Sequence, residues 1–162
     1  CSSDLDACRE RNLKIGSSTG YTHELMEIVL AEAARQGFRP DAMQCADDVD
    51  EGRPAPWMCF ENARRLGVYP MSAVVKVDDT AVGVEAGRNA GAWTVGITRS
   101  GNLVGLTLDE IQRHDPDDLR NRIAAAEARL YGAGAHYTLD SIADLLPVLD
   151  DIELRLGRGE MP

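Results

Sequence analysis

The chain has 162 residues, 44% of them hydrophobic, which is enough for one α/β domain, or most of one, with a buried core. Its formal net charge is −10, and an acidic surface repels nucleic-acid phosphates and anionic lipids at long range. The composition therefore argues against nucleic acid and membranes as partners. A bound metal cation would suit this charge, although most of the 27 acidic side chains are expected to be solvated surface.

The start of the chain and its cysteines point to a soluble, cytoplasmic protein. The first residues lack the basic and apolar regions of a signal peptide, and no stretch reaches the roughly 18 apolar residues of a membrane span. The cysteines at positions 1, 8, 45 and 59 show no C-x-x-C spacing and no histidines at zinc-finger separations, which predicts reduced thiols. Because there is no initial methionine and residues 4–12 resemble the tail of an interrupted helix, we also expect that the natural beginning is missing.

From residue 13 onward, apolar runs alternate with helical patterns, which is typical of βα units around a parallel sheet. Strands are predicted at residues 13–18, 42–45, 73–77 and 93–97, with a short edge strand at 135–138. Helices are predicted from a cap at Thr22 to a stop at Gly37, at 57–66, from 80 to 90, at 108–131 with a break at Pro116, and at 141–156. No repeat or domain boundary is evident, so a single unit over residues 1–162 is expected.

Polar segments follow the predicted strands, and in open parallel sheets the ligand crevice lies beyond the carboxyl ends of the strands. The first such segment is Ser17–Thr22, where hydroxyls, Gly20 and the amides of a starting helix make an anion site suited to phosphate. The alternative interpretation is an ordinary turn followed by a helix cap.

The second segment is Asp78-Asp79-Thr80, at the end of the most apolar strand. Two adjacent carboxylates repel each other unless a cation compensates, and magnesium is the natural candidate. A helix-capping turn would explain the same residues.

The third segment is Gly52–Trp57, in which two prolines stiffen the backbone around Arg53. The guanidinium of Arg53 can offer a planar, permanently charged fork to a phosphoryl group. A solvent-exposed loop arginine is the alternative.

Together these segments resemble the phosphonoacetaldehyde hydrolases of the haloacid dehalogenase superfamily. The matching runs are Lys14–Thr22, Gly52–Met58, Val75–Thr80 and Glu85–Gly96, within a similarity that extends from about residue 9 to about 153. The resemblance implies a partial Rossmann-like α/β core, with a mostly parallel sheet flanked by helices and without the cap domain. It also implies hydrolysis of the carbon–phosphorus bond of phosphonoacetaldehyde, giving acetaldehyde and phosphate, in the degradation of 2-aminoethylphosphonate.

The family's mechanism implies roles for particular residues of this chain. Asp79 would be the ligand of Mg²⁺, Thr19 and the amide of Gly20 would bind the phosphoryl oxygens, and Arg53 would clamp the same group. Gly83 stands where many superfamily members carry a second acidic residue, so Asp78 would supply the additional charge from a second shell.

Two parts of the family's machinery are not found in this sequence. The nucleophile motif Asp-x-Ala-Gly-Thr does not occur, and Lys14 and Lys76, the only lysines, do not match the Schiff-base lysine of the cap. We therefore expect a core fragment without its N-terminal strand and cap, which holds no catalytic residue and is inactive alone, while the full-length enzyme is implied to be a homodimer. A non-catalytic Mg²⁺/phosphate-binding module and a receiver-like signalling domain remain alternatives.

Overall fold

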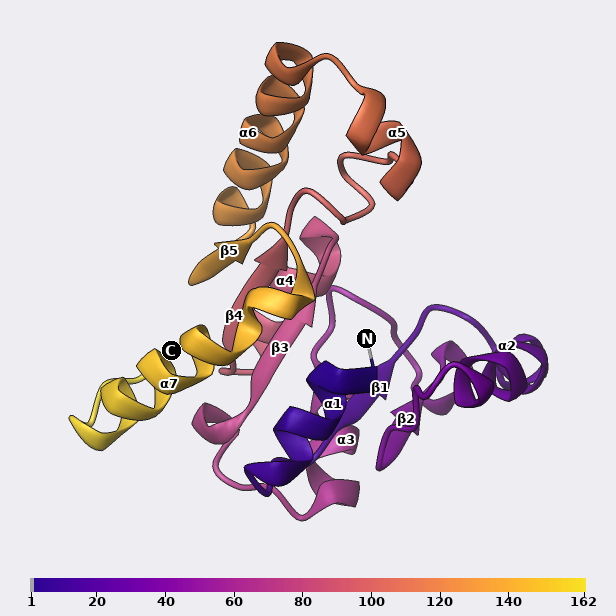
Figure 1. The fold of residues 1–162 in the computed structure, drawn as a ribbon. Helices are drawn as coiled ribbons and strands as arrows, with labels where there is room; N and C mark the ends of the chain where they lie inside the picture. Colours follow the sequence, from indigo (N-terminus) through magenta and orange to yellow (C-terminus); the bar gives the residue numbers. More distant parts are fainter. Residues whose placement is uncertain (1) are drawn as a thin grey trace.

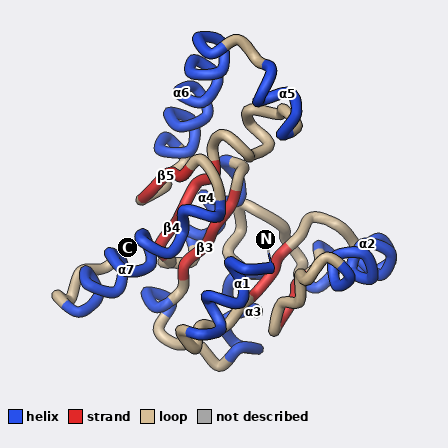
Figure 2. Tube along the Cα trace, in the orientation of Figure 1, coloured by secondary structure: helices blue, strands red, loops and turns tan. Residues whose placement is uncertain are grey.

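The structure is a computed structural model that describes residues 2–162, with side chains from residue 4 onward. In chain order, its helices and strands are α1 (Ser2–Glu10), β1 (Gly16–Ser18), α2 (His23–Arg35), β2 (Ala42–Gln44), α3 (Trp57–Leu66), β3 (Val75–Asp78), α4 (Ala81–Asn89), β4 (Trp93–Ile97), α5 (Leu108–Arg113), α6 (Pro116–Gly132), β5 (Tyr137–Leu139) and α7 (Leu145–Gly157), with short 3₁₀ turns at Ala46–Asp48, Met71–Ala73 and Ile142–Asp144. Figures 1 and 2 show the strands at the centre of the molecule, with helices around them.

The strand pairs are all parallel, and they form two sheets. β1 pairs with β2, so that Gly16 lies opposite Ala42. In the second sheet β4 lies between β3 and β5, with Val75 opposite Trp93 and Val95 opposite Tyr137. The predicted α/β architecture with parallel strands and flanking helices is confirmed, whereas its division into two sheets was not predicted.

The two sheets lie beside each other (Figure 1). One side chain bridges them. The ammonium of Lys76 on β3 donates a hydrogen bond of 3.2 Å to the hydroxyl of Ser18 on β1. Helix α3 packs on β1 and β2, and α4 packs on β3 and β4. The carboxyl ends of β1 and β3 therefore meet in one region.

The core centres on β4, where all five residues are buried. Trp93 and Val95 have no exposed surface, and Leu130 of α6 and Val84 of α4 are equally buried. Continuous burial explains why this strand is an unbroken apolar run in the sequence, and its predicted bounds are confirmed.

The start of α2 is capped from outside the helix. Thr22 occupies the N-cap position as predicted, but its side chain makes no capping hydrogen bond. Instead both carboxylate oxygens of Asp47, at 3.1 and 3.2 Å, accept the backbone N–H of His23. The first βα unit is therefore fastened to the turn that follows β2.

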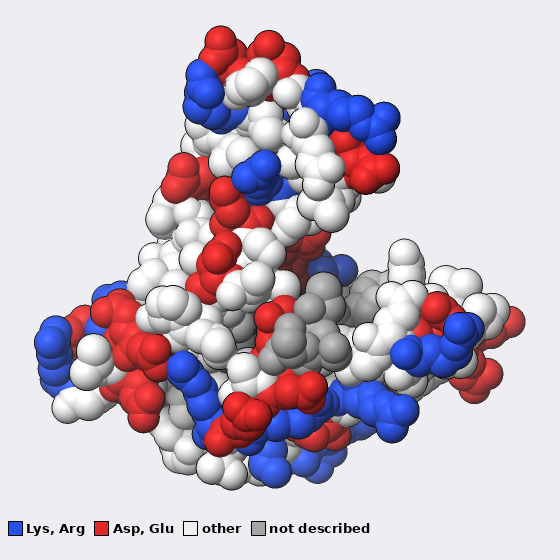
Figure 3. Space-filling view, viewed as in Figure 1, with Lys and Arg blue, Asp and Glu red and all other residues white. Residues whose placement is uncertain are grey.

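Helices α5 and α6 extend away from the sheets and enclose a small apolar cluster of their own (Figure 1). Its buried members are Val104, Ile111, Leu119 and Ala126. Acidic and basic side chains are interspersed over these helices on the face shown in Figure 3. Across residues 2–162, no helix has the length and apolar character needed to cross a bilayer.

His136 is half-buried and packs against Trp93 beside β4. Its Nδ1 accepts a hydrogen bond of 3.0 Å from the N–H of Thr94, and its ring lies 5.1 Å from that of Trp93. Burial, followed by the charges of Arg88 and Arg155, lowers the pKa of His136 below its ordinary value. The unfolded chain therefore takes up this proton at a higher pH than the folded chain does.

We expect His136 to reduce the free energy of unfolding as the pH falls from about 7.5 to about 5.5, relative to a variant without this ring, because protonation of His136 favours the unfolded state. The measurement is urea unfolding across this range, comparing the parent chain with His136→Gln, which should lose part of the pH dependence. The control is His114→Gln, since His114 is paired with Asp118 on the projecting helices. An unchanged pH dependence in His136→Gln would show that this imidazole is not responsible.

Candidate functional site

Thr19 and Gly20 leave the carboxyl end of β1, as predicted. The N–H of Thr19 donates a hydrogen bond of 3.0 Å to the carbonyl of Gln44, and its hydroxyl accepts one of 3.2 Å from the N–H of Tyr21. A Cβ atom added to Gly20 would lie 3.0 Å from Nη2 of Arg53. The absence of a side chain at Gly20 therefore lets the guanidinium come close to the backbone of this loop.

Arg53 projects from the loop between β2 and α3 and reaches the end of β3. Its Nη1 lies 3.6 Å from Oδ2 of Asp78, and its side chain is 25% exposed. The following Pro54, joined by a cis peptide, accepts a hydrogen bond of 2.9 Å from the side-chain amide of Asn89 on α4. Arg53 thus lies between the Gly20 loop and Asp78. The residue that follows it, Pro54, is hydrogen-bonded to α4.

Asp78 is a buried anion whose two oxygens are both engaged. Oδ1 accepts hydrogen bonds from the N–H and the hydroxyl of Thr80, at 3.0 and 2.7 Å, and Oδ2 accepts one of 2.9 Å from Lys76. Burial raises the pKa of Asp78, but the charge of Lys76 and the hydrogen bonds from Lys76 and Thr80 outweigh it, so the net shift is downward. This carboxylate therefore remains ionised and has little capacity left to bind a metal directly.

Lys76 belongs to the same cluster, although the sequence analysis only excluded it as the Schiff-base lysine and gave it no place in the site. Its side chain is 14% exposed and lies between Ser18 and Asp78. The spacing contained a signal for this position, because residues two apart on a strand point to the same face. Lys76 and Asp78 are such a pair.

Asp79 faces the loop that follows β4. Its Oδ2 accepts a hydrogen bond of 2.8 Å from the N–H of Asn102. Within residues 2–162, its Oδ1 has no hydrogen bond or ion pair, and Asp79 makes no direct polar contact with Thr19 or Arg53. The structure therefore brings Gly20, Arg53 and Asp78 together, while Asp79 lies beside them at the end of β3.

The available oxygen of Asp79 suits a hard cation. Mg²⁺ in phosphate-handling sites is held by one or two carboxylates, together with water and substrate oxygens. Asp79 can supply one such ligand, with its other oxygen oriented by the backbone of Asn102. Asp78, already held by Lys76 and Thr80, fits an outer position.

Gly83 makes room for the carboxylate of Asp78. It lies in the first turn of α4, and its N–H donates a hydrogen bond of 3.1 Å to the hydroxyl of the capping residue Thr80. A Cβ atom added at Gly83 would overlap the carboxyl group of Asp78. The Asp78 carboxylate thus lies where a side chain of residue 83 would begin.

The parallel strands, the covering helices and the polar residues at the strand ends define a Rossmann-like α/β protein. The family model for haloacid dehalogenase-like hydrolases matches residues 5–91, and the chain belongs to this family.

Phosphonoacetaldehyde hydrolases are among its relatives, as the sequence resemblance predicted. This chain is 51% identical over 158 residues to the phosphonoacetaldehyde hydrolase of Nitratidesulfovibrio vulgaris. The alignment covers 98% of this chain and 56% of that protein. The phosphonoacetaldehyde hydrolase of Paraburkholderia xenovorans is 47% identical over 156 residues, covering 96% and 58%.

A solved structure of a similar protein has the same fold as this chain. The crystal structure of a phosphonoacetaldehyde hydrolase-like protein from Oleispira antarctica matches with a TM-score of 0.96 and 42% identity, covering 99% of this chain and 58% of that one. The chain therefore spans a little over half the length of these relatives.

The steric relation between Gly83 and Asp78 can be measured as a coupling. Gly83→Ala should destabilise the fold by about 1–3 kcal/mol, as overpacking of a filled site does. In an Asp78→Ala background the same change should be neutral or stabilising by up to about 1 kcal/mol, because alanine is the better helix former. Chemical denaturation of the four proteins gives the coupling energy.

Gly87→Ala on the same helix is the matched control, since its Cβ would meet Thr94 and Lys76. It should be destabilising with either residue at position 78. Equal costs of Gly83→Ala in both backgrounds would show that Asp78 does not occupy this space.

Proposed function

We propose that this chain is the phosphate- and metal-binding portion of a phosphonoacetaldehyde hydrolase, which hydrolyses the carbon–phosphorus bond of phosphonoacetaldehyde to acetaldehyde and phosphate in 2-aminoethylphosphonate degradation. One observation carries the proposal: the Arg53 guanidinium lies between the Gly20 loop and the acidic end of β3. The similarity to enzymes named for this activity supplies the substrate.

In this proposal, Arg53 grips the phosphonate group of the substrate. A guanidinium can form two parallel hydrogen bonds to phosphoryl oxygens, and partial burial strengthens them. The hydroxyl of Thr19 and the amide of Gly20 are proposed to bind the remaining oxygens. The close approach of Arg53 to Gly20 supports this, because one anion can then contact both groups.

Asp79 is proposed to hold Mg²⁺, which when bound neutralises negative charge on the phosphoryl oxygens. Asp78 adds charge from a second shell, where Lys76 and Thr80 fix its orientation. The absence of a side chain at Gly83 supports this role. The Asp78 carboxylate lies in the space that the side chain of a larger residue 83 would occupy.

The nucleophile and the Schiff-base lysine are proposed to belong to the part of the relatives that this chain does not span. The chain alone is accordingly proposed to bind phosphate without turning over substrate. The alternative is a non-catalytic Mg²⁺/phosphate-binding module.

The proposal extends to the setting of the whole protein. The cytoplasm suits the free thiols of Cys8, Cys45 and Cys59, which persist in a reducing compartment. A homodimer suits the exposed aromatic pair on α3, where Trp57 is 48% and Phe60 is 36% exposed. A second copy would remove this apolar surface from water.

Joining this chain to the N-terminal segment of the Nitratidesulfovibrio vulgaris relative should produce an enzyme that releases acetaldehyde from phosphonoacetaldehyde. Asp79→Ala in this chimera should reduce the rate at least about 100-fold, since a catalytic metal contributes several kcal/mol of charge stabilisation. Acetaldehyde release is followed with a coupled alcohol dehydrogenase. The control is Asp109→Ala, an exposed carboxylate on α5.

A folded chimera that binds Mg²⁺ and phosphate but releases no acetaldehyde would support the non-catalytic module. Full activity without Asp79 would overturn the metal assignment.

Arg53→Lys should weaken the binding of inorganic phosphate to the chain by about 10- to 100-fold, because lysine keeps the charge but loses the paired hydrogen bonds. Isothermal titration in the presence of Mg²⁺ measures the affinity. Arg64→Lys is the matched control, since this exposed arginine on α3 pairs only with Glu61 among the described residues. If the two variants bind phosphate with equal affinity, the assignment of Arg53 to the phosphate site is wrong.

A further inference from the structure

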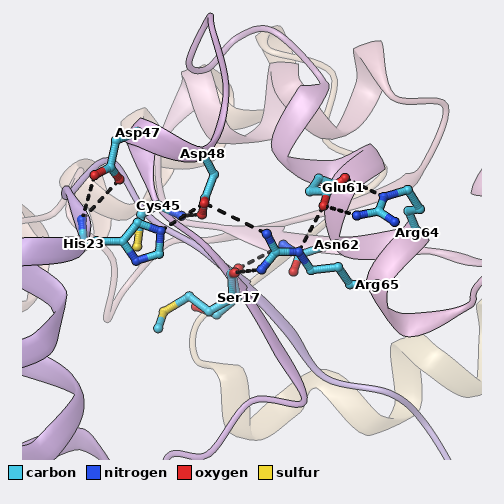
Figure 4. A network of polar contacts seen from close by, with 10 residues as sticks. Ser17, His23, Cys45, Asp47, Asp48, Glu61, Asn62, Arg64 and Arg65 are labelled. Atoms are coloured by element: carbon cyan, nitrogen blue, oxygen red, sulfur yellow. Dashed lines mark hydrogen bonds and ion pairs between the residues drawn. The ribbon is translucent and has the colours of Figure 1, made fainter.

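A second polar cluster lies where α2 begins and β2 ends. Nε2 of His23 lies 2.9 Å from Oδ1 of Asp48 in the turn after β2. One ligand atom each of His23, Cys45 and Asp48 lies within 4.8 Å of the others. Figure 4 shows the imidazole of His23 beside the Cys45 side chain and directed toward the Asp48 carboxylate.

These three groups match the coordination chemistry of zinc. Imidazole nitrogen, thiolate sulfur and carboxylate oxygen bind Zn²⁺ at about 2.0–2.3 Å, which separates neighbouring ligands by about 3.3–3.8 Å in a tetrahedron. The observed separations, all within 4.8 Å, are close to this spacing. We propose that His23, Cys45 and Asp48 form a binding site for a zinc-class divalent cation, separate from the proposed magnesium site and independent of the proposed function.

The surrounding contacts already hold the Asp48 carboxylate and the backbone of His23 in place. Oδ2 of Asp48 accepts a hydrogen bond of 2.7 Å from the N–H of Cys45, which leaves Oδ1 directed at His23. Asp47 holds the backbone N–H of His23 with both carboxylate oxygens. Such hydrogen bonds fix ligand geometry in metal sites and reduce the ordering that binding requires.

Exposure gives the site one closed side and one open side. Cys45 has no exposed surface, the Asp48 side chain is 15% exposed, and the His23 side chain is 59% exposed. A cation can therefore enter past His23 and take water as its fourth ligand, as three-ligand zinc sites do.

The charges nearby do not prevent a cation from binding. Arg65 is the cation that reaches this cluster, with Nη2 4.0 Å from Oδ1 of Asp48. Its Nε donates a hydrogen bond of 3.0 Å to Glu61, which offsets its charge. Asp47 adds a second carboxylate beside His23.

The ligand types also separate this site from the one at Asp79. Thiolate and imidazole favour zinc and its neighbours over Mg²⁺, which prefers oxygen ligands. The cysteine spacing in the sequence did not reveal the cluster, because His23 and Cys45 meet only through the pairing of β1 with β2.

Co²⁺ titration tests the site, because a cobalt ion bound by a thiolate shows sulfur-to-metal charge-transfer absorption in the near ultraviolet. The experiment uses the chain with Cys1→Ser and Cys8→Ser, so that these two thiols do not compete. We expect one Co²⁺ per chain, displaced by Zn²⁺ but not by excess Mg²⁺. His23→Gln should weaken binding at least about tenfold, and Cys45→Ser should abolish the charge-transfer band.

His114→Gln is the matched control, since His114 also pairs with an aspartate but has no cysteine in its ion pair. Asp79→Ala should likewise leave the spectrum unchanged, which separates this inference from the proposed function. An absent band in the parent chain, or an equal band in His23→Gln, would overturn the site. Because His23 is largely exposed, its replacement tests the proposal even if Cys45→Ser fails to fold.

Discussion

The carboxylate of Asp78 connects the two sheets and the loop that bears Arg53. It is bound to Lys76, which also reaches Ser18 on the other sheet, and it lies within ion-pair distance of Arg53. A buried carboxylate without such partners costs several kcal/mol, so the surrounding groups must hold their positions for the fold to keep it charged. The cluster thereby fixes the strand ends that form the candidate site.

This arrangement also reconciles an acidic protein with the anionic ligand proposed for it. At a net charge of −10 the chain repels anions at long range. Arg53 and Lys76 supply positive charge at the strand ends, and Asp78 balances only part of it. Short-range contacts in a partly buried region outweigh the distant surface charges, which salt screens.

Much of the fold could be predicted from the sequence because its elements have strong local signals. The bounds of α3 and β4 were predicted correctly, since one begins after two prolines and the other is fully buried. The first strand was predicted from residue 13 but begins at Gly16, because Ile15 is bonded to Asp41 instead of continuing the ladder. The division into two sheets could not be predicted, because the hydrophobic pattern within a segment does not say which strands pair with each other.

The candidate site could also be predicted only where its residues have local sequence signals. Residue types and strand ends pointed to Thr19, Gly20, Arg53, Asp78 and Asp79. The structure brings Gly20, Arg53 and Asp78 together, while Asp79 contacts Asn102 instead of Arg53. The contact of Lys76 with Ser18 could not be predicted, because it depends on how two separate sheets lie beside each other. The fit between Gly83 and Asp78 likewise appears only once α4 is packed against β3.

The capping of α2 by Asp47 links two consecutive βα units. The first turn of that helix follows directly on the Gly20 loop, yet its stabilising carboxylate comes from the turn after the next strand. Without the turn after β2, the backbone N–H of His23 would lack this acceptor, and the Gly20 loop would lead into an uncapped helix. Local order at this loop is thus a property of two neighbouring units assembled together.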